Sequence, residues 1–315
     1  MEISNKTLYR YAGGKNRVKN DIAKEIHSIV PNLKNIVAPF FGGGSVEILL
    51  ASQGVKVDAY DVFEPLTDFW HYVLNEEDGQ ERLGKVLRQN HPLNVKKQDY
   101  PLLDSNGKVV HKLQRKVDGT VKTKKDGTPY KKVVLDSEKN KQANEFNREH
   151  YKTYLPLLDS SDRFTRAWAF YILMKGSYSG KIGCSTYLSR EEFRIVGIEK
   201  MEKFHNPNLS VSLGDCFDVI PDNPDTFMYL DPPYADTVST YYGVDGSLHK
   251  GFDHIKLANI LKNHKGGFLM SYDNSSQVVD LYKGWTEFRY ITIPYQMSGT
   301  KRYDKKELMI VKHPS

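Results

Sequence analysis

The segment Leu230-Asp231-Pro232-Pro233-Tyr234 combines a carboxylate, a stiff backbone and a flat ring within five residues. It follows an apolar run, so we expect it at the carboxyl end of a strand, where open α/β sheets bind their ligands. The two prolines fix φ and remove two backbone donors, but their carbonyl groups still accept hydrogen bonds. Asp231 and the Pro232 carbonyl therefore suit an amine with two N–H bonds, and Tyr234 can stack on a planar ring.

An exocyclic amine of a nucleobase requires such a set of groups. Its lone pair is delocalised into the ring, which makes the nitrogen a poor nucleophile. Two acceptors that hold both N–H bonds favour a pyramidal nitrogen, whose lone pair can then point at the methyl group of a sulfonium. A proline-stiffened loop after a strand is the alternative explanation, and the α/β context favours the functional one.

A second segment, Ala38-Pro39-Phe40-Phe41-Gly42-Gly43-Gly44-Ser45, is a glycine turn between an expected strand and an expected helix. Glycines in such a turn let a ligand approach the backbone closely. The spacing differs from that of a P-loop and from Gly-x-Gly-x-x-Gly, which argues against a dinucleotide. Asp61 ends the next expected strand, where an acid can accept hydrogen bonds from ribose hydroxyls, and Asp58 and Glu64 are its rivals.

The elements that must position these segments alternate between strands and helices, which predicts an α/β fold with one open sheet. Strands are expected at residues 35–40, 56–62, 210–214, 226–230, 267–271, 288–293 and 308–311. Helices are expected at residues 15–30, 45–51, 64–74, 163–175, about 190–204, 253–262 and 275–282.

A basic insertion interrupts this pattern. Apolar periodicity fades from residue 76 to about residue 160, and residues 106–141 hold eleven Lys and Arg against four acids. Turn signals at Asp118-Gly119 and Asp126-Gly127, with loosely alternating valines, predict one or two exposed, basic β-hairpins. A solvated, partly disordered insertion is the alternative.

The composition excludes several classes of protein. The chain has 315 residues, 39% of them hydrophobic, and no apolar run near the ~20 residues that a membrane helix needs. No signal peptide is visible, so we expect a cytoplasmic protein. Neither Cys184, Cys216 nor the ten histidines show metal-ligand spacing, so we expect no metal. The formal net charge of +6 points only weakly to a polyanionic partner.

A third segment, Tyr9-Arg10-Tyr11-Ala12-Gly13-Gly14-Lys15, precedes the other two and by itself fits a cap on the first helix. The three segments in this order resemble the Dam-type DNA adenine-N6 methyltransferases, the α-ordered group. The resemblance covers residues 8–75 and roughly 165–312. It includes three short stretches, Tyr178-Ser179-Gly180, Ser271-Tyr272-Asp273-Asn274 and Lys306-Glu307-Leu308-Met309-Ile310.

The resemblance implies a Rossmann-like, S-adenosylmethionine-dependent methyltransferase sheet of seven mostly parallel strands. Residues 1–75 and 206–315 would form the catalytic domain, and residues 76–205 an inserted target-recognition region. The implied activity is site-specific transfer of a methyl group from S-adenosyl-L-methionine to adenine N6 in double-stranded DNA, with base flipping. A bacterial or phage origin is implied, with no membrane partner, while the target sequence, a paired restriction enzyme and the oligomeric state stay open.

The resemblance also implies roles for single residues. The catalytic set is Asp231, Pro232 and Tyr234, and the cofactor set is Tyr11, Lys15, Phe40, Gly42, Gly44, Asp61, Asp215 and Asp231. For DNA binding we expect Tyr178, Lys181, Arg190 and Arg194, and the lysine excess of the insertion adds Lys122, Lys124 and Lys125. The stretch from Ser189 to Ile195 differs from its Gly-Ala-Thr-Cys-specific relatives, so no target sequence is implied.

Several other functions remain to be separated from this one. A cytosine-N4 methyltransferase would use the same chemistry, but usually with Ser-Pro-Pro-Tyr, so Asp231 favours adenine. Enzymes that methylate protein glutamine usually carry Asn-Pro-Pro-Tyr, and an RNA methyltransferase is a further alternative. A catalytically silent DNA-binding relative is disfavoured by the intact Lys15, Asp61 and Asp231. Attack on cytosine carbon 5 needs a Pro-Cys nucleophile, which the chain lacks.

Overall fold

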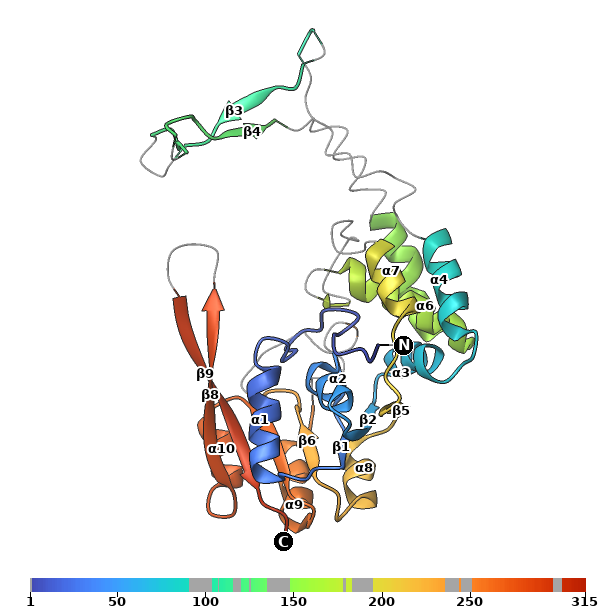
Figure 1. Cartoon of the computed structure of the whole chain (residues 1–315), viewed down its shortest axis with the longest axis vertical. Coiled ribbons are helices and arrows are strands. Elements are labelled where there is room, and N and C mark those ends of the chain that lie inside the picture. The colour runs from blue at the N-terminus through green and yellow to red at the C-terminus, as the bar shows by residue number, and fades with distance from the viewer. Residues whose placement is uncertain are drawn as a thin grey trace.

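A seven-stranded sheet forms the centre of the protein in the computed structural model (Figure 1), with strand order β5-β2-β1-β6-β7-β9-β8. The structure describes residues 2–90, 104–106, 108–115, 120–124, 126–134, 148–177, 180–182, 195–235, 244, 251–296 and 302–315. The strands are β1 Asn35–Ala38, β2 Lys56–Asp61, β5 Leu209–Leu213, β6 Met228–Leu230, β7 Phe268–Tyr272, β8 Glu287–Gln296 and β9 Arg302–Lys312. Only β9 runs against the other strands of this sheet, between β7 and β8, so the predicted mostly parallel sheet is confirmed.

Helices cover both faces of the sheet. One face carries α1 (Lys19–Ile29), α2 (Ser45–Ser52) and α3 (Glu64–Leu74), and the other carries α8 (Cys216–Asp222), α9 (His254–Asn263) and α10 (Ser276–Tyr282). Because side chains alternate along a strand, Leu269 of β7 packs in the first core, while Phe268 and Met270 pack in the second. Burial on both faces explains why the central strands are continuously apolar.

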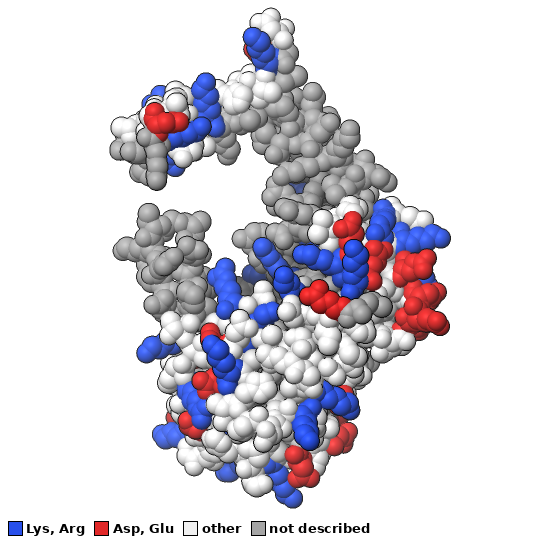
Figure 2. Space-filling view, viewed as in Figure 1, with Lys and Arg blue, Asp and Glu red and all other residues white. Residues whose placement is uncertain are grey.

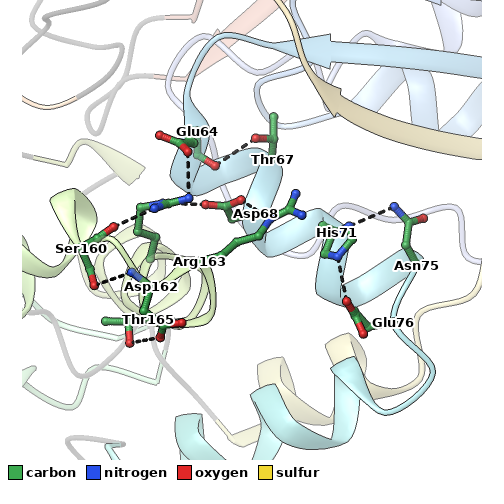
Figure 3. A network of polar contacts seen from close by, with 11 residues as sticks. Glu64, Thr67, Asp68, His71, Asn75, Glu76, Ser160, Asp162, Arg163 and Thr165 are labelled. Atoms are coloured by element: carbon green, nitrogen blue, oxygen red, sulfur yellow. Dashed lines mark hydrogen bonds and ion pairs between the residues drawn. The ribbon is translucent and has the colours of Figure 1, made fainter.

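Three further helices extend this layer. Helices α4 (Gly79–Gln89) and α6 (Arg163–Gly176) pack beside α3, and α7 (Ile195–Glu202) packs against α4. The rings of Phe69 and Tyr171 stack between α3 and α6, with centroids 5.0 Å apart. Asp68 of α3 is buried and accepts hydrogen bonds from Nε of Arg163 at 2.5 Å and of Arg166 at 2.7 Å (Figure 3). The helical part of the expected insertion therefore shares a core with the helix that follows β2.

The structure contains two helices that the sequence did not predict, and it shifts the start of two predicted ones. Helix α4 lies where no helix is expected, because most of its residues are polar or charged. Its apolar stripe is Leu83, Val86 and Leu87, of which the two leucines are fully buried. Helix α8 is also unexpected, since it has seven residues and contains Pro221. The first helix begins at Lys19 rather than Lys15, after a turn in which the Gly14 amide donates to the Tyr11 carbonyl. Helix α7 begins at Ile195, and residues 183–194 lie outside the described part.

The basic insertion contains the predicted hairpin. Strands β3 (His111–Leu113) and β4 (Lys131–Val133) pair in antiparallel fashion, and two isolated bridges, Arg115 to Val121 and Thr123 to Pro129, continue the pairing. Figure 1 draws this pair apart from the main sheet, and Figure 2 shows Lys and Arg side chains along it. Lys122 and Lys124 are exposed, so the described residues form a hairpin with basic side chains at its surface.

Candidate active site

The site lies where the strand order reverses. The chain leaves β1 towards β2 and β5 on one side, and leaves β6 towards β7 on the other, so a crevice opens beyond the carboxyl ends of β1 and β6. A cavity of about 320 Å³ occupies this place. Its lining brings together residues from all three sequence segments, including Tyr11, Lys15, Phe40, Gly42, Gly44, Asp61, Asp215 and Asp231.

The glycine turn after β1 has a backbone conformation that other residue types could adopt only with strain. Gly42 and Gly44 adopt φ of 49° and 62°, in the left-handed region. A Cβ on Gly42 would lie 2.9 Å from the ring of Tyr11, so the glycine also permits a close approach of that ring. The Asp61 carboxylate accepts hydrogen bonds from the amides of Gly42 at 2.8 Å and Phe63 at 2.9 Å. Asp61 thereby ties the turn to the end of β2.

Tyr9 supports the same turn, a role that the sequence does not reveal. Its hydroxyl donates to the Gly42 carbonyl at 3.1 Å and accepts from Trp70 Nε1 at 2.8 Å. The tyrosine is buried, so both contacts satisfy polar groups that water does not reach. Tyr9 is the first residue of the N-terminal segment identified in the sequence, but nothing in that segment indicates its contact with the turn.

Lys15 and Asp231 form the central ion pair of the site. Lys15 Nζ lies 2.5 Å from Asp231 Oδ1 and also donates to the Gly13 carbonyl at 3.1 Å. Lys15 is only 5% exposed. Burial raises the pKa of Asp231, and the Lys15 ammonium lowers it in part. The Asp231 carboxylate is therefore held in place by Lys15 and is partly shielded from water.

The loop that follows Asp231 is fixed at two further points. The Ala235 amide donates to Asp273 Oδ1 at 2.9 Å, and the ring of Tyr234 stacks on Tyr272 with centroids 6.1 Å apart. The Tyr234 hydroxyl donates to Glu307, which the sequence analysis did not assign to the site. Pro232 lies between the two fixed residues Asp231 and Tyr234 in this stiff loop.

Two buried polar residues of the cavity are also missing from the sequence-based set. Glu47 lies in the first turn of α2 and is 3% exposed, and burial raises its pKa to about 8. Tyr229, on β6, has a buried hydroxyl without a hydrogen-bond partner in the described part of the chain. A charged residue inside the apolar run Val46 to Ala51 is the signal that marks Glu47.

The other end of the cavity is aromatic. Phe252 stacks on Phe217 with centroids 5.5 Å apart and meets Phe40 edge-on at 5.8 Å. Asp215 caps α8 by accepting from the Phe217 amide at 2.8 Å, and it lines the cavity beside these rings. A flat heterocycle with polar edges fits such an environment.

The residues expected to bind DNA lie away from this cavity or outside the described part. Tyr178, Arg190, Arg194 and Lys125 lie outside it. Lys181 is partly exposed in the short described stretch that follows α6. Lys122 and Lys124 are on the hairpin.

The described residues contain no group of three or more His, Cys, Asp or Glu side chains placed to hold a metal ion. Among the same residues, no helix has both the length and the apolar composition needed to cross a bilayer.

Comparison with known families agrees with this geometry. Residues 11–298 match the family described as D12 class N6 adenine-specific DNA methyltransferase. No curated protein matches the chain. The family match favours adenine N6 over the alternatives, and methyltransferases of this kind generally use S-adenosylmethionine. With most of its length covered and the three motifs at one cavity, the chain belongs to the D12 class N6 adenine-specific DNA methyltransferases.

Proposed function

We propose that this enzyme methylates an adenine that is turned out of double-stranded DNA, and that S-adenosylmethionine binds in the cavity beside β1 and β6. The observation that carries the proposal is the meeting of three segments, distant in sequence, around that cavity. Lys15, the glycine turn and Asp231 come from these segments, and Lys15 and Asp231 are in direct contact.

The lining of the cavity fits this cofactor from end to end. The rings of Phe217 and Phe252, with Asp215, suit an adenine. Asp61 lies at the end of β2, where ribose hydroxyls are bound in related folds. Glu47 and Asp231 suit the positively charged methionine end, where the hydroxyl of Tyr229 lacks a partner among the described residues. A buried hydroxyl without a partner is unusual, and a polar ligand group would satisfy it.

The residues of the Asp-Pro-Pro-Tyr loop hold the substrate amine. When bound, S-adenosylmethionine supplies a methyl group on a positively charged sulfur. Lys15 contacts Oδ1 of Asp231, so Oδ2 is assigned to one N–H of the amine and the Pro232 carbonyl to the other. The nitrogen loses a proton when it gains a methyl group, and Asp231, whose pKa is raised by burial, is placed to accept it.

Base flipping follows from the position of these groups. The N6 amine of a paired adenine lies inside the base stack and cannot reach the half-buried Asp231 carboxylate without leaving the stack. Extrusion costs a few kcal/mol, which stacking on Tyr234 and contacts in the pocket must offset. The ring of Tyr234 is held by Tyr272, which keeps it in place for stacking.

We assign residues 1–75 and 206–315 to the catalytic domain and residues 76–205 to target recognition. Base contacts are assigned to the segment that includes Tyr178, Lys181, Arg190 and Arg194. Phosphate contacts are assigned to Lys122, Lys124 and Lys125 of the hairpin region. Lysine is a flexible point charge suited to phosphate, whereas guanine readout favours arginine.

The test is transfer of labelled methyl groups from S-adenosylmethionine to duplex DNA by Asp231→Ala. We expect a loss of roughly 100- to 1,000-fold in rate, because one preorganised polar contact to the reacting group is removed. Asp280→Ala is the control, since Asp280 is 73% exposed and does not line the cavity. An Asp231→Ala rate within a few-fold of wild type would contradict the proposal.

A further inference from the structure

Glu307 is a buried carboxylate at the edge of the sheet that carries the site. It lies on β9, one residue before Leu308, which pairs with Tyr272 at the end of β7. Because β9 runs antiparallel to β7, Glu307 lies beyond the carboxyl end of β7, beside the loop that follows β6. It is 4% exposed and does not line the cavity.

The contacts of Glu307 Oε1 are with residues of the site and of its neighbouring strand. It accepts hydrogen bonds from the hydroxyls of Tyr234 and, at 2.8 Å, of Ser271. Lys15 Nζ lies 3.6 Å away and is therefore placed between Glu307 and Asp231. Both the ring and the ammonium that flank the reactive carboxylate are tied to this one oxygen.

These contacts fix Tyr234 in two ways. Tyr272 stacks on the ring, and Glu307 holds the hydroxyl at the edge. Stacking alone leaves a ring free to slide, whereas a hydrogen bond at its far end removes that freedom. A buried carboxylate is a weak source of stability, because its desolvation opposes the gain from its contacts. Its placement beside Tyr234 and Lys15 is better explained by a role in the reaction.

We propose that Glu307 is a positioning residue for methyl transfer, which holds the ring of Tyr234 and the ammonium of Lys15 in their working geometry. The inference rests on the proposed roles of Tyr234 and Asp231. It adds a residue that touches neither the cofactor cavity nor the base and acts through these neighbours.

A double-mutant cycle tests whether Glu307 acts through the Tyr234 hydroxyl. Glu307→Ala should lower kcat on the order of 100-fold, the effect of a displacement of about 1 Å at a reacting group. The KM for S-adenosylmethionine should change little. Tyr234→Phe removes the hydroxyl and should lower kcat less, and the double variant should be no slower than Glu307→Ala alone. Thermal unfolding with the cofactor present shows that each variant is folded.

The pH dependence of kcat in Glu307→Gln is a second test. It would not differ from that of the wild type if Glu307 had only a structural role. Burial raises the pKa of Glu307 to about 7. Among the described residues, Lys15, Asp231, Tyr229 and Tyr234 are the ionisable groups that face it. Wild-type kcat should fall as the pH drops through this range, because protonated Glu307 releases Lys15. Glutamine still accepts from Tyr234 but, like protonated Glu307, has no charge to hold Lys15. Its kcat should therefore already be low at neutral pH, and the part of the acid limb that is due to Glu307 should be absent.

Three results separate the possible failures. Additive effects in the cycle, or Glu307→Ala within twofold of wild type, would overturn the role of Glu307. An unchanged acid limb in Glu307→Gln would overturn its link to Lys15. Absence of adenine methylation by the wild-type enzyme would instead contradict the proposed function.

Discussion

Glu47 shows how strongly this site depends on single buried charges. It lies in the first turn of α2, where the positive end of the helix dipole favours a negative side chain. Desolvation nevertheless outweighs that effect, and the neighbouring Asp231 adds to it, so the pKa rises from 4.5 to about 8. A cationic ligand in the cavity would favour the ionised form. The protonation state of Glu47 therefore depends on the charge of the ligand in the cavity.

The pH dependence of stability should reveal this residue. Between pH 4.5 and 8, Glu47 keeps its proton in the folded protein and loses it in the unfolded chain. The unfolded state then binds fewer protons, so the free energy of unfolding falls as the pH rises through this window. Glu47→Gln removes the effect and should raise the Tm of the cofactor-free protein by several degrees at pH 8.

At pH 4.5 the same substitution should change the Tm little, because the two states then differ less in bound protons. Glu81→Gln on α4 is the control, since its side chain is exposed. Differential scanning calorimetry at both pH values is the measurement. An equal gain at pH 4.5 and 8 would mean that titration of Glu47 is not the cause.

At the scale of elements, the end of β2 organises the cavity. Both oxygens of Asp61 accept backbone amides, one from the glycine turn and one from the start of α3. At 100 times its dissociation constant, S-adenosylmethionine should stabilise the protein by about 2.7 kcal/mol. Asp61→Ala should reduce the resulting melting shift at fixed ligand concentration. Asp58→Ala is the control, because Asp58 lies on the same strand and does not line the cavity.

A nicotinamide dinucleotide serves as the opposite test for this cavity. A melting shift with the dinucleotide and none with S-adenosylmethionine would contradict the cofactor assignment. Equal shifts for wild type and Asp61→Ala would leave the cofactor and remove Asp61 from its binding.

The contact between α3 and α6 is the second feature at this scale (Figure 3). Asp68 is 3% exposed and pairs with both Arg163 and Arg166. Asp68→Ala leaves two guanidinium groups without this carboxylate. The pair with Arg166 is largely buried, and loss of one member of a buried pair costs about 3 kcal/mol. Chemical denaturation should show this loss. Glu76→Ala breaks only an exposed pair with His71 and should cost about 0.5 kcal/mol or less, so similar losses would contradict the argument.

At the scale of the whole molecule, the described residues of the basic hairpin do not line the cavity. Lys122 and Lys124 are exposed on this hairpin. If each contacts a phosphate, Lys122→Ala with Lys124→Ala should weaken binding to all duplexes alike. The slope of log affinity against log salt should fall by about 0.9 for each phosphate that is no longer neutralised. Site preference should stay the same.

Lys24→Ala with Lys283→Ala is the matched control, since both lysines are more than 70% exposed and lie outside the hairpin. Fluorescence anisotropy at several salt concentrations gives the slopes, and sequencing of methylated DNA gives the preference. A changed target sequence would mean that the hairpin reads bases. Unchanged slope and affinity would leave it without a role in binding.

The sequence by itself determined the sheet and the chemistry. Apolar runs and helical stripes predicted all seven strands of the main sheet, and α3 has the predicted bounds, Glu64–Leu74. These features are local, since period and turn residues are written in neighbouring positions. The Asp-Pro-Pro-Tyr loop is local as well, so its residue types alone indicate the chemistry. Helix α4 was not predicted, although Leu83, Val86 and Leu87 have helical spacing, because most of the other residues in this segment are polar or charged.

Only the tertiary structure decided which side chains share the site. Lys15 and Asp231 are 216 positions apart, and no spacing rule joins them. Glu47, Tyr229 and Glu307 join the same cluster because helix α2 and strands β6 and β9 meet at one edge of the sheet. Burial, and with it each raised pKa, depends on what the other segments cover. These properties arise from packing between distant parts of the chain, which a local pattern does not contain.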